Sequence, residues 1–276
     1  MLSPTPGAIG IFDSGYGGLT IFEKIARLLP EYDYIYLGDN ARAPYGTRSF
    51  DVVYEFTLQS VEKLFEMGCH LVILACNTAS AKALRTIQQK DLPHIAPNRR
   101  VLGIIRPTVE MLDGLTKSKH VGILGTVGTI QSNSYALEIQ KLFPEIKVVG
   151  EACPMWVPLV ENNEYETAGA DFFIKKNIDH LLKNDSQIDT LILACTHFPL
   201  LLNKIKQFVS PNINIISQGE IVAESLKQYL QVHPEIEQKC SKNGKRTFYT
   251  TEEKQKFAES ASVFLKHAVS AKRIAL

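Results

Sequence analysis

Two cysteines stand in matching contexts and are the residues of this sequence best suited to chemistry. Cys76 ends the run Leu-Val-Ile-Leu-Ala-Cys, and Cys195 ends the run Thr-Leu-Ile-Leu-Ala-Cys. A thiol just before a helix is stabilised as a thiolate by the unpaired N–H groups of the first turn, which predicts a lowered pKa. A single cysteine after an apolar run is commonly a packing residue. Two in the same context, each followed by polar residues, favour a functional pair.

Two thiols in one site suit the inversion of a stereocentre by proton transfer. One face of the carbon needs a base and the other needs an acid, and a thiolate with a thiol serves both directions. Redox cysteines usually lie close together as Cys-x-x-Cys, and a phosphatase-type cysteine needs a Gly/Arg loop directly after it. Zinc needs more ligands than Cys76, Cys195 and His197 provide. The residue types therefore favour proton transfer.

Polar residues near the ends of other apolar runs extend the candidate site. Asp13 and Ser14 are placed to orient a substrate ammonium group or to assist a thiol, although such residues also commonly cap a helix. The glycine-rich turn after them hints at dinucleotide binding but lacks the spacing G-x-G-x-x-G. His197 is a candidate partner for Cys195, because a histidine beside a thiol exchanges a proton near neutral pH. Glu161 is a second candidate, although a lone glutamate in a charged loop is more often simply solvated.

Two further loops offer backbone and hydroxyl groups. The turn Pro44-Tyr45-Gly46 can present backbone amides to a carboxylate. Thr126 and Thr129 follow another apolar run and suit equally the capping of a helix and contact with a ligand.

The elements that must position these residues alternate between strands and helices. Helices are expected from Leu19 and around Ile178, where apolar residues recur at helical spacing. Short apolar runs between them are typical of strands buried on both faces of a parallel sheet, and the alternation predicts an α/β fold. Ligands bind such sheets beyond the carboxyl ends of the strands, where both cysteines fall. The expected strands are Ala8–Phe12, Tyr34–Leu37, Leu71–Ala75, Val101–Ile104, Val121–Leu124, Lys147–Val149, Leu191–Ala194, Ile213–Ile216 and Thr247–Tyr249.

A weak internal repeat indicates a duplicated unit. Residues 9–14 resemble residues 121–126, and residues 71–78 resemble residues 190–197. We therefore expect two similar doubly wound parallel-sheet domains, related by pseudo-twofold symmetry, with the active site in the cleft between them. Each domain then contributes one cysteine at the same strand end.

The chain is expected to cross twice between these domains. Two prolines within residues 92–100 indicate the first crossing, and the second is expected near Ser217. The predicted first domain comprises residues 1–99 plus 218–276 and carries Cys76. The predicted second domain comprises residues 100–217 and carries Cys195.

Composition sets limits on partners and compartment. A length of 276 residues suits about two domains, and a net charge of +1 provides no field to attract nucleic acid or an acidic membrane. Neither a signal peptide nor a run long enough to span a membrane is visible. The 5 cysteines are too sparse for a disulfide scaffold and suit a reducing cytoplasm.

Six motifs together resemble the glutamate racemase family along nearly the whole chain. They are IGIFDSGYGGLT, GDNARAPYG, ILACNTASA, VGILGTVGTIQSNSY, ACPMWVPLVE and LILACTHFPLL. The resemblance implies interconversion of L- and D-glutamate without a cofactor or a metal, and a supply of D-glutamate for peptidoglycan in the bacterial cell wall. It also implies a homodimer.

The same resemblance implies roles for individual residues. Cys76 would deprotonate D-glutamate with help from Asp13, and Cys195 would deprotonate L-glutamate. His197 and Glu161 would assist Cys195. The implied substrate contacts are Asp13, Ser14, Pro44, Tyr45, Gly46, Asn77, Thr78, Thr196 and His197.

Two alternatives stay open at this point. An aspartate racemase would differ only in the length of substrate it accepts, and a two-domain amino-acid-binding protein would capture its ligand without turnover. One local departure from the family is visible: Arg106 and Thr108 stand where the family more often has a Pro-Gly pair without the arginine. This bears on the geometry of the domain junction.

Overall fold

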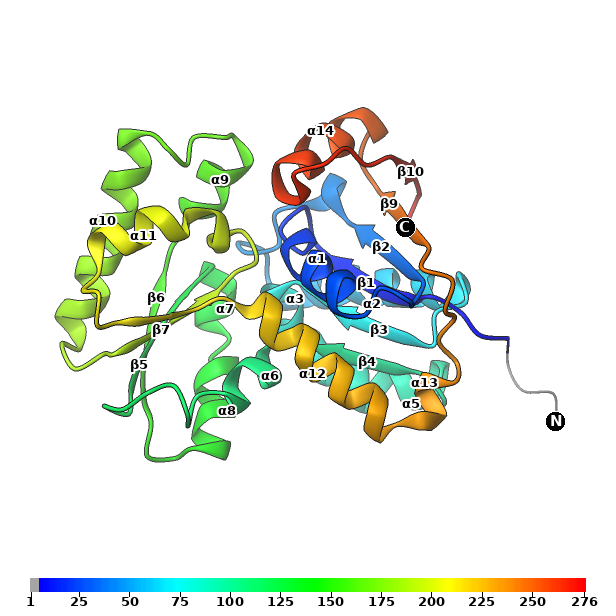
Figure 1. Cartoon of the computed structure of the whole chain (residues 1–276), viewed down its shortest axis with the longest axis horizontal. Helices are drawn as coiled ribbons and strands as arrows, with labels where there is room; N and C mark the ends of the chain where they lie inside the picture. Colours follow the sequence, from blue (N-terminus) through cyan, green and yellow to red (C-terminus); the bar gives the residue numbers. More distant parts are fainter. Residues whose placement is uncertain (1–4) are drawn as a thin grey trace.

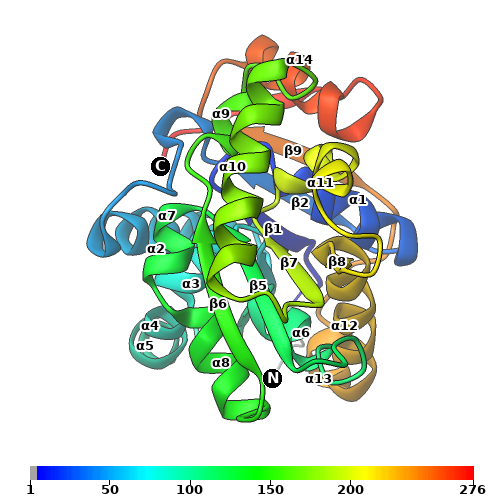
Figure 2. The ribbon, with the colours of Figure 1, turned by 90° about the vertical axis from the view of Figure 1, so that its left-hand side faces the viewer.

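The computed structural model describes residues 5–276 as two β-sheets with helices packed around them (Figures 1 and 2). The 6-stranded sheet has the order β10-β9-β2-β1-β3-β4, and the 4-stranded sheet has the order β6-β5-β7-β8. Every pair of neighbouring strands is parallel. The strands are β1 Ile9–Asp13, β2 Tyr34–Gly38, β3 Leu71–Leu74, β4 Arg100–Gly103, β5 His120–Gly125, β6 Lys147–Ala152, β7 Thr190–Ala194, β8 Asn214–Ile216, β9 Arg246–Thr250 and β10 Ala271–Arg273.

Helices connect the parallel strands, as such connections require. The main helices are α1 Leu19–Leu28, α2 Phe50–Glu66, α3 Asn77–Lys82, α6 Ile105–Glu110, α7 Val127–Gln131, α8 Ser134–Leu142, α9 Trp156–Glu161, α10 Ala168–Asn184, α11 Leu202–Phe208, α12 Gln218–Val232 and α14 Lys254–Leu265. Shorter segments are α4 Leu84–Thr86, α5 Leu92–Ile95, α13 Pro234–Glu237, the 3₁₀ turns Asn40–Arg42 and Phe198–Leu201, and a π turn Ile87–Asp91. Among residues 5–276, no helix combines the length and the apolar character needed to cross a bilayer.

The predicted α/β class with two parallel-sheet units is confirmed. The order β2-β1-β3-β4 in one sheet repeats as β6-β5-β7-β8 in the other, so β3 and β7 occupy equivalent positions. Cys76 and Cys195 each lie two residues or fewer beyond the end of these equivalent strands. The predicted strands are all present, and β10 is an addition: its short, polar sequence carries no apolar run that would indicate a strand.

The first expected domain boundary needs correction. β4 pairs with β3 through Leu71 and Arg100 to Leu74 and Gly103, so it is the edge of the larger sheet, although residues 100–217 were expected to form the second domain. We propose that the first domain continues through β4 and resumes at α12. That helix begins at Gln218, after β8 of the smaller sheet, and packs against α1 beside the larger sheet (Figure 1).

Three groups of buried apolar side chains form the core. The largest group extends through both units. It contains Ile11 of β1 and Ile25 of α1 in one unit, and Ile178 of α10 and Leu191 of β7 in the other. A second group lies between the larger sheet and α2, and a third lies between the smaller sheet and α6 and α8. Because helices cover both faces of each sheet, the central strands β1, β3, β5 and β7 are buried along their whole length.

Replacing Leu191 with alanine is expected to lower the free energy of unfolding by about 3 kcal/mol, because it opens a cavity in a close-packed core. Leu191 lies on the central strand β7 and is 0% exposed. Leu137→Ala is the matched control, because Leu137 is 63% exposed on α8 and its truncation should cost no more than about 0.5 kcal/mol. Urea unfolding of both variants measures the difference, and equal losses would contradict this description of the core.

Candidate active site

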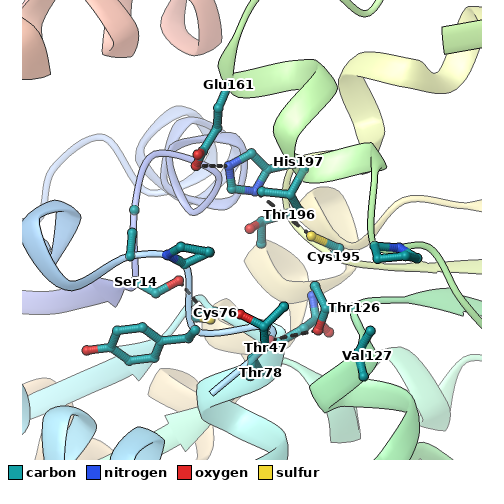
Figure 3. A pocket seen from close by; sticks show the side chains of 18 of the residues that line it. Ser14, Thr47, Cys76, Thr78, Thr126, Val127, Glu161, Cys195, Thr196 and His197 are labelled. Carbon is teal, nitrogen blue, oxygen red and sulfur yellow. Dashed lines mark hydrogen bonds and ion pairs between the residues drawn. The ribbon is translucent and has the colours of Figure 1, made fainter. Parts of the chain in front are cut away.

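One cavity of about 120 Å³ lies between the two units, beyond the carboxyl ends of their strands (Figure 3). Side chains from both units line it, and Cys76 and Cys195 reach it from different sheets. Of the residues for which the resemblance implied a catalytic or substrate-binding role, all except Asp13 line the cavity. They are Ser14, Pro44, Tyr45, Gly46, Cys76, Asn77, Thr78, Glu161, Cys195, Thr196 and His197.

Cys76 caps the N-terminus of α3 and is 5% exposed. Its Sγ lies 3.4 Å from the backbone N–H of Ala79, which donates to it, and 3.3 Å from Ser14 Oγ. Burial and, to a smaller extent, the negative charge of Asp13 raise the pKa of the Cys76 thiol to about 12, against the lowering effect of the hydrogen bonds from Ser14 and Ala79. The expectation of a lowered pKa is therefore wrong for Cys76, because burial outweighs the first turn of this short helix.

Cys195 directly follows β7 and is 6% exposed beside His197. His197 Nδ1 lies 3.9 Å from Cys195 Sγ, and His197 Nε2 lies 2.9 Å from Oε1 of Glu161, the last residue of α9 (Figure 3). Burial alone lowers the pKa of His197, but its hydrogen bonds to Cys195 and Glu161 and their charges raise it to about 10. The imidazole is therefore protonated at neutral pH and donates from both nitrogens.

The two thiols consequently have different electrostatic surroundings. Cys195 faces a cationic imidazolium 3.9 Å from its Sγ. Cys76 is buried beside Asp13, and burial together with that negative charge favours the neutral form of its thiol. The two sulfur atoms therefore differ in the charge that faces them, which is positive at Cys195 and negative at Cys76.

Asp13 lies behind the wall of the cavity and does not line it. It is 1% exposed, its Oδ2 accepts the N–H of Gly15 at 2.9 Å, and its Oδ1 has no hydrogen-bond partner among residues 5–276. Burial raises the pKa of Asp13, opposed by the charge of His197. Its influence on Cys76 is therefore electrostatic, and direct contact with a substrate in the cavity would require a movement of the loop.

The glycines after Asp13 have a packing role. A Cβ on Gly17 would lie 2.4 Å from Thr196 Oγ1 and 2.5 Å from His197 Nδ1. A Cβ on Gly18 would lie 2.5 Å from Asp13 Cβ. Only glycine lets this turn approach the opposite wall so closely. This close approach accounts for the glycine-rich pattern without a dinucleotide.

The turn at residues 44–46 lines the cavity mainly through its backbone. Tyr45 is 1% exposed and its hydroxyl donates to Asp39, so this hydroxyl is already committed. Arg42 Nε also donates to Asp39, at 2.6 Å, so Asp39 links Arg42 to Tyr45 of the turn. The carbonyl of Gly46 accepts the N–H of Gly128 at 2.7 Å, which joins the turn to α7 of the other unit.

Three threonine hydroxyls meet where the two units touch. Thr78 Oγ1 lies 3.0 Å from Thr126 Oγ1 and 3.4 Å from Thr129 Oγ1. Thr126 lines the cavity and also caps α7 by accepting the N–H of Thr129 at 3.2 Å, so it combines both of the roles considered for it. Thr129 is buried and lies outside the cavity lining.

Several lining residues escaped the sequence-based reasoning. Most are apolar or small, and such residues give no chemical signal in a single sequence. Cys153 is one of them and is 0% exposed. The signal that could have found it is its place in the motif ACPMWVPLVE, which also contains Glu161. The lining residues not singled out are Gly15, Ala43, Thr47, Val127, Cys153, Pro154, Val157 and Pro158.

The fold and the cavity define a class of protein: paired parallel-sheet units that place a thiol from each of two equivalent strand ends in one cavity. The family model for Asp/Glu/Hydantoin racemase matches residues 9–226. The chain belongs to this racemase family.

Individual relatives agree with the family assignment. A glutamate racemase of a Sulfurihydrogenibium species is 38% identical over 250 residues, which are 90% of each chain. The crystal structure of a glutamate racemase isoform from Bacillus anthracis superposes with a TM-score of 0.89 at 38% identity, covering 98% of both chains. The glutamate racemase from Francisella tularensis, crystallised in complex with D-glutamate, has a TM-score of 0.86 at 32% identity, covering 99% of this chain and 98% of that one.

Proposed function

We propose that this protein interconverts L- and D-glutamate by passing the Cα proton between Cys195 and Cys76. The observation that carries the proposal is the shared cavity, in which one thiol lies beside a protonated imidazole and the other is held neutral by burial. The choice of glutamate is supported by relatives of that name at 35–39% identity and by the similar Francisella tularensis structure that holds D-glutamate.

The reaction from L-glutamate begins with the thiolate of Cys195. It removes the Cα proton while His197 and Glu161 balance the charge, and the thiol of Cys76 donates its proton to the opposite face. The Cα–H bond breaks on one face, a new one forms on the other, and the pair of electrons stays on carbon between the two steps. Cys76 is left as a thiolate, with Ser14 and the N–H of Ala79 as hydrogen-bond donors, ready to deprotonate D-glutamate.

The substrate's two carboxylates would be bound largely by uncharged groups, because His197 is the cationic side chain that lines the cavity in the described part of the chain. Within the described part of the chain, no lysine or arginine side chain lines the cavity. Hydroxyl groups of Ser14, Thr78 and Thr196 and the backbone N–H groups of Tyr45 and Gly46 belong to residues that line the cavity. Such fixed dipoles stabilise charge in a site shielded from water, including the negative charge that reaches the α-carboxylate when the proton leaves.

We further propose a cytoplasmic homodimer that supplies D-glutamate for peptidoglycan, and so for the cell wall and cell shape. The five cysteines are all free thiols in the structure, which suits a reducing compartment. The peptidoglycan role and the dimer rest on the resemblance to glutamate racemases.

The proposal is tested by incubating the protein in heavy water with L-glutamate and, separately, with L-aspartate. D-Glutamate should accumulate to the equal mixture that enantiomers require, and it should carry deuterium at Cα because solvent exchanges with the cysteine thiols. Chiral chromatography and mass spectrometry measure both quantities. Turnover of aspartate should be at least about 100-fold slower, since a substrate one methylene shorter loses its distal contacts in a fitted cavity.

The possible results are clearly separated. D-Glutamate without solvent deuterium would contradict proton transfer through the two thiols. Faster turnover of aspartate would identify an aspartate racemase, and binding of glutamate without any turnover would identify a binding protein.

A further inference from the structure

Asn77, the residue directly after Cys76, belongs to a buried hydrogen-bonded ring that spans the domain junction. Asn77 Nδ2 donates to Gln218 Oε1 at 2.6 Å, and the hydroxyl of Tyr135 donates to Asn77 Oδ1 at 2.7 Å. Gln218 Nε2 lies 2.8 Å from the Tyr135 hydroxyl and closes the ring. All three side chains are at most 3% exposed. They come from α3, α8 and α12. Since α3 follows β3 of the larger sheet and α8 lies between β5 and β6 of the smaller sheet, the ring joins the two units.

The direction of every hydrogen bond in this ring is fixed by one carbonyl. Gln218 Nε2 also faces Thr108 Oγ1 at 2.9 Å and the carbonyl of Ile104 at 3.2 Å. A carbonyl oxygen only accepts, so the nitrogen of Gln218 must point toward Ile104 and its oxygen toward Asn77. The hydroxyl of Thr108 donates to Ile104 at 2.8 Å, which leaves its oxygen free to accept from Gln218.

This polarity determines what Asn77 offers to the cavity that it lines. Its Oδ1 is occupied by Tyr135, and one of the two hydrogens on Nδ2 is occupied by Gln218. The second hydrogen on Nδ2 is therefore the hydrogen-bonding group that the Asn77 side chain still offers to a ligand. A reversed amide would present its oxygen instead, and an oxygen would repel a substrate carboxylate.

We propose that Tyr135 and Gln218 are positioning residues that lock Asn77 as an N–H donor to a carboxylate of the substrate. The inference rests on the proposed glutamate racemisation. The proposal also gives a role to the point near residue 218 where the chain returns to the first unit. Gln218, the first residue of α12, orients the substrate-binding amide of Asn77. The proposal further separates the two departures from the family pattern: Thr108 belongs to this network, whereas Arg106 pairs with Glu110 at 2.8 Å on the exposed side of α6.

Tyr135→Phe tests the lock, because it removes the hydroxyl and keeps the ring volume. The Michaelis constant for glutamate should rise about tenfold in both directions, while kcat changes by no more than about threefold, since a hydrogen bond to the charged substrate is weakened and the thiols are untouched. In an Asn77→Ala background, the added Tyr135→Phe should leave KM unchanged, because the effect passes through Asn77. Racemisation is followed by circular dichroism.

Tyr34→Phe is the matched control. The Tyr34 hydroxyl donates to the carbonyl of Leu29 at 2.7 Å, and the residue is 1% exposed and lies outside the cavity lining. It should show a comparable fall in melting temperature with an unchanged KM. A merely structural role for Tyr135 would give both variants the same kinetic result.

The outcomes separate this inference from the proposed function. An inactive wild-type protein would overturn the proposed function itself. With an active wild type, an unchanged KM in Tyr135→Phe, or a rise in KM that persists in the Asn77→Ala background, would overturn the lock. If Tyr135→Phe fails to fold, Gln218→Met removes the amide at nearly constant length and should raise KM by a similar factor; an unchanged KM there would also overturn the lock.

Discussion

Replacing Cys76 with serine is expected to abolish racemisation of glutamate, with kcat/KM falling by roughly 10³-fold or more. A serine hydroxyl is far too weak an acid to replace a thiol that must give up its proton to carbon and take it back. Burial already raises the pKa of the Cys76 thiol to about 12, and a serine hydroxyl in the same place would be a weaker acid still. Binding of glutamate should be largely retained, because the size of the side chain is nearly conserved. Chiral chromatography measures the loss of turnover, and calorimetry measures the retained binding.

Isotope exchange shows which face each thiol serves. Cys76→Ser should still exchange the Cα hydrogen of L-glutamate with heavy water through Cys195, without inversion, and Cys195→Ser should do the same for D-glutamate only. Cys240→Ser is the matched control, since Cys240 is 5% exposed, as Cys76 is, and lies outside the cavity lining. Turnover by Cys76→Ser within about tenfold of the wild type would rule out Cys76 as an acid or base.

The cysteine pair could be predicted because a local pattern repeats at equivalent positions of the fold. The same apolar run precedes Cys76 and Cys195, and the strand order places β3 and β7 equivalently in the two sheets. A strand buried on both faces requires such a run, and the sheet topology then brings its end to the site. Sequence alone therefore contained both the chemistry and the element that positions it.

The electrostatics of the site depended on tertiary burial, which no local pattern contains. The position of Cys76 before a helix correctly indicated a hydrogen bond from Ala79, yet burial reverses the net direction of the pKa shift. Asp13 follows its strand as expected, but its carboxylate turns toward Gly15 and stays behind the cavity wall. In both residues the identity and the location were predictable, and the environment was not.

Long-range pairing explains the remaining differences. Prolines near residue 97 do interrupt the periodicity, but β4 still returns to pair with β3, because hydrogen bonding between strands is decided by the whole sheet. Tyr135 and Gln218 lie within ordinary helices and far from Asn77 in the sequence. Only the fold brings these three side chains together, so the ring that orients Asn77 could not be predicted from the sequence.

His197→Asn is expected to lower kcat/KM by about 100-fold, because asparagine cannot carry the positive charge that faces the sulfur of Cys195. The pH profile should change as well. Hydrogen bonds and charges from Cys195 and Glu161 raise the pKa of His197 to about 10, so the wild-type imidazole keeps its proton through neutral pH and loses it as the pH rises through that value. Wild-type activity should therefore fall in that range, and the variant should lack this fall.

Exchange at Cα distinguishes this role from general damage to the site. Enantiomers have an equilibrium constant of one, so kcat/KM must fall equally in both directions whichever thiol is impaired. The impairment should instead appear as a difference between the two enantiomers in the rate of Cα hydrogen exchange with solvent. For D-glutamate, His197→Asn should exchange this hydrogen through Cys76 faster than it racemises the substrate. For L-glutamate, exchange should be no faster than racemisation. His120→Asn is the matched control, since His120 Nδ1 pairs with Asp185 at 2.6 Å, outside the cavity lining. Equal exchange from both enantiomers in His197→Asn would show that the imidazolium does not assist Cys195. A fall in activity near pH 10 that persists in the variant would show the same. The charge balance of the site would then rest on Glu161 and the backbone alone.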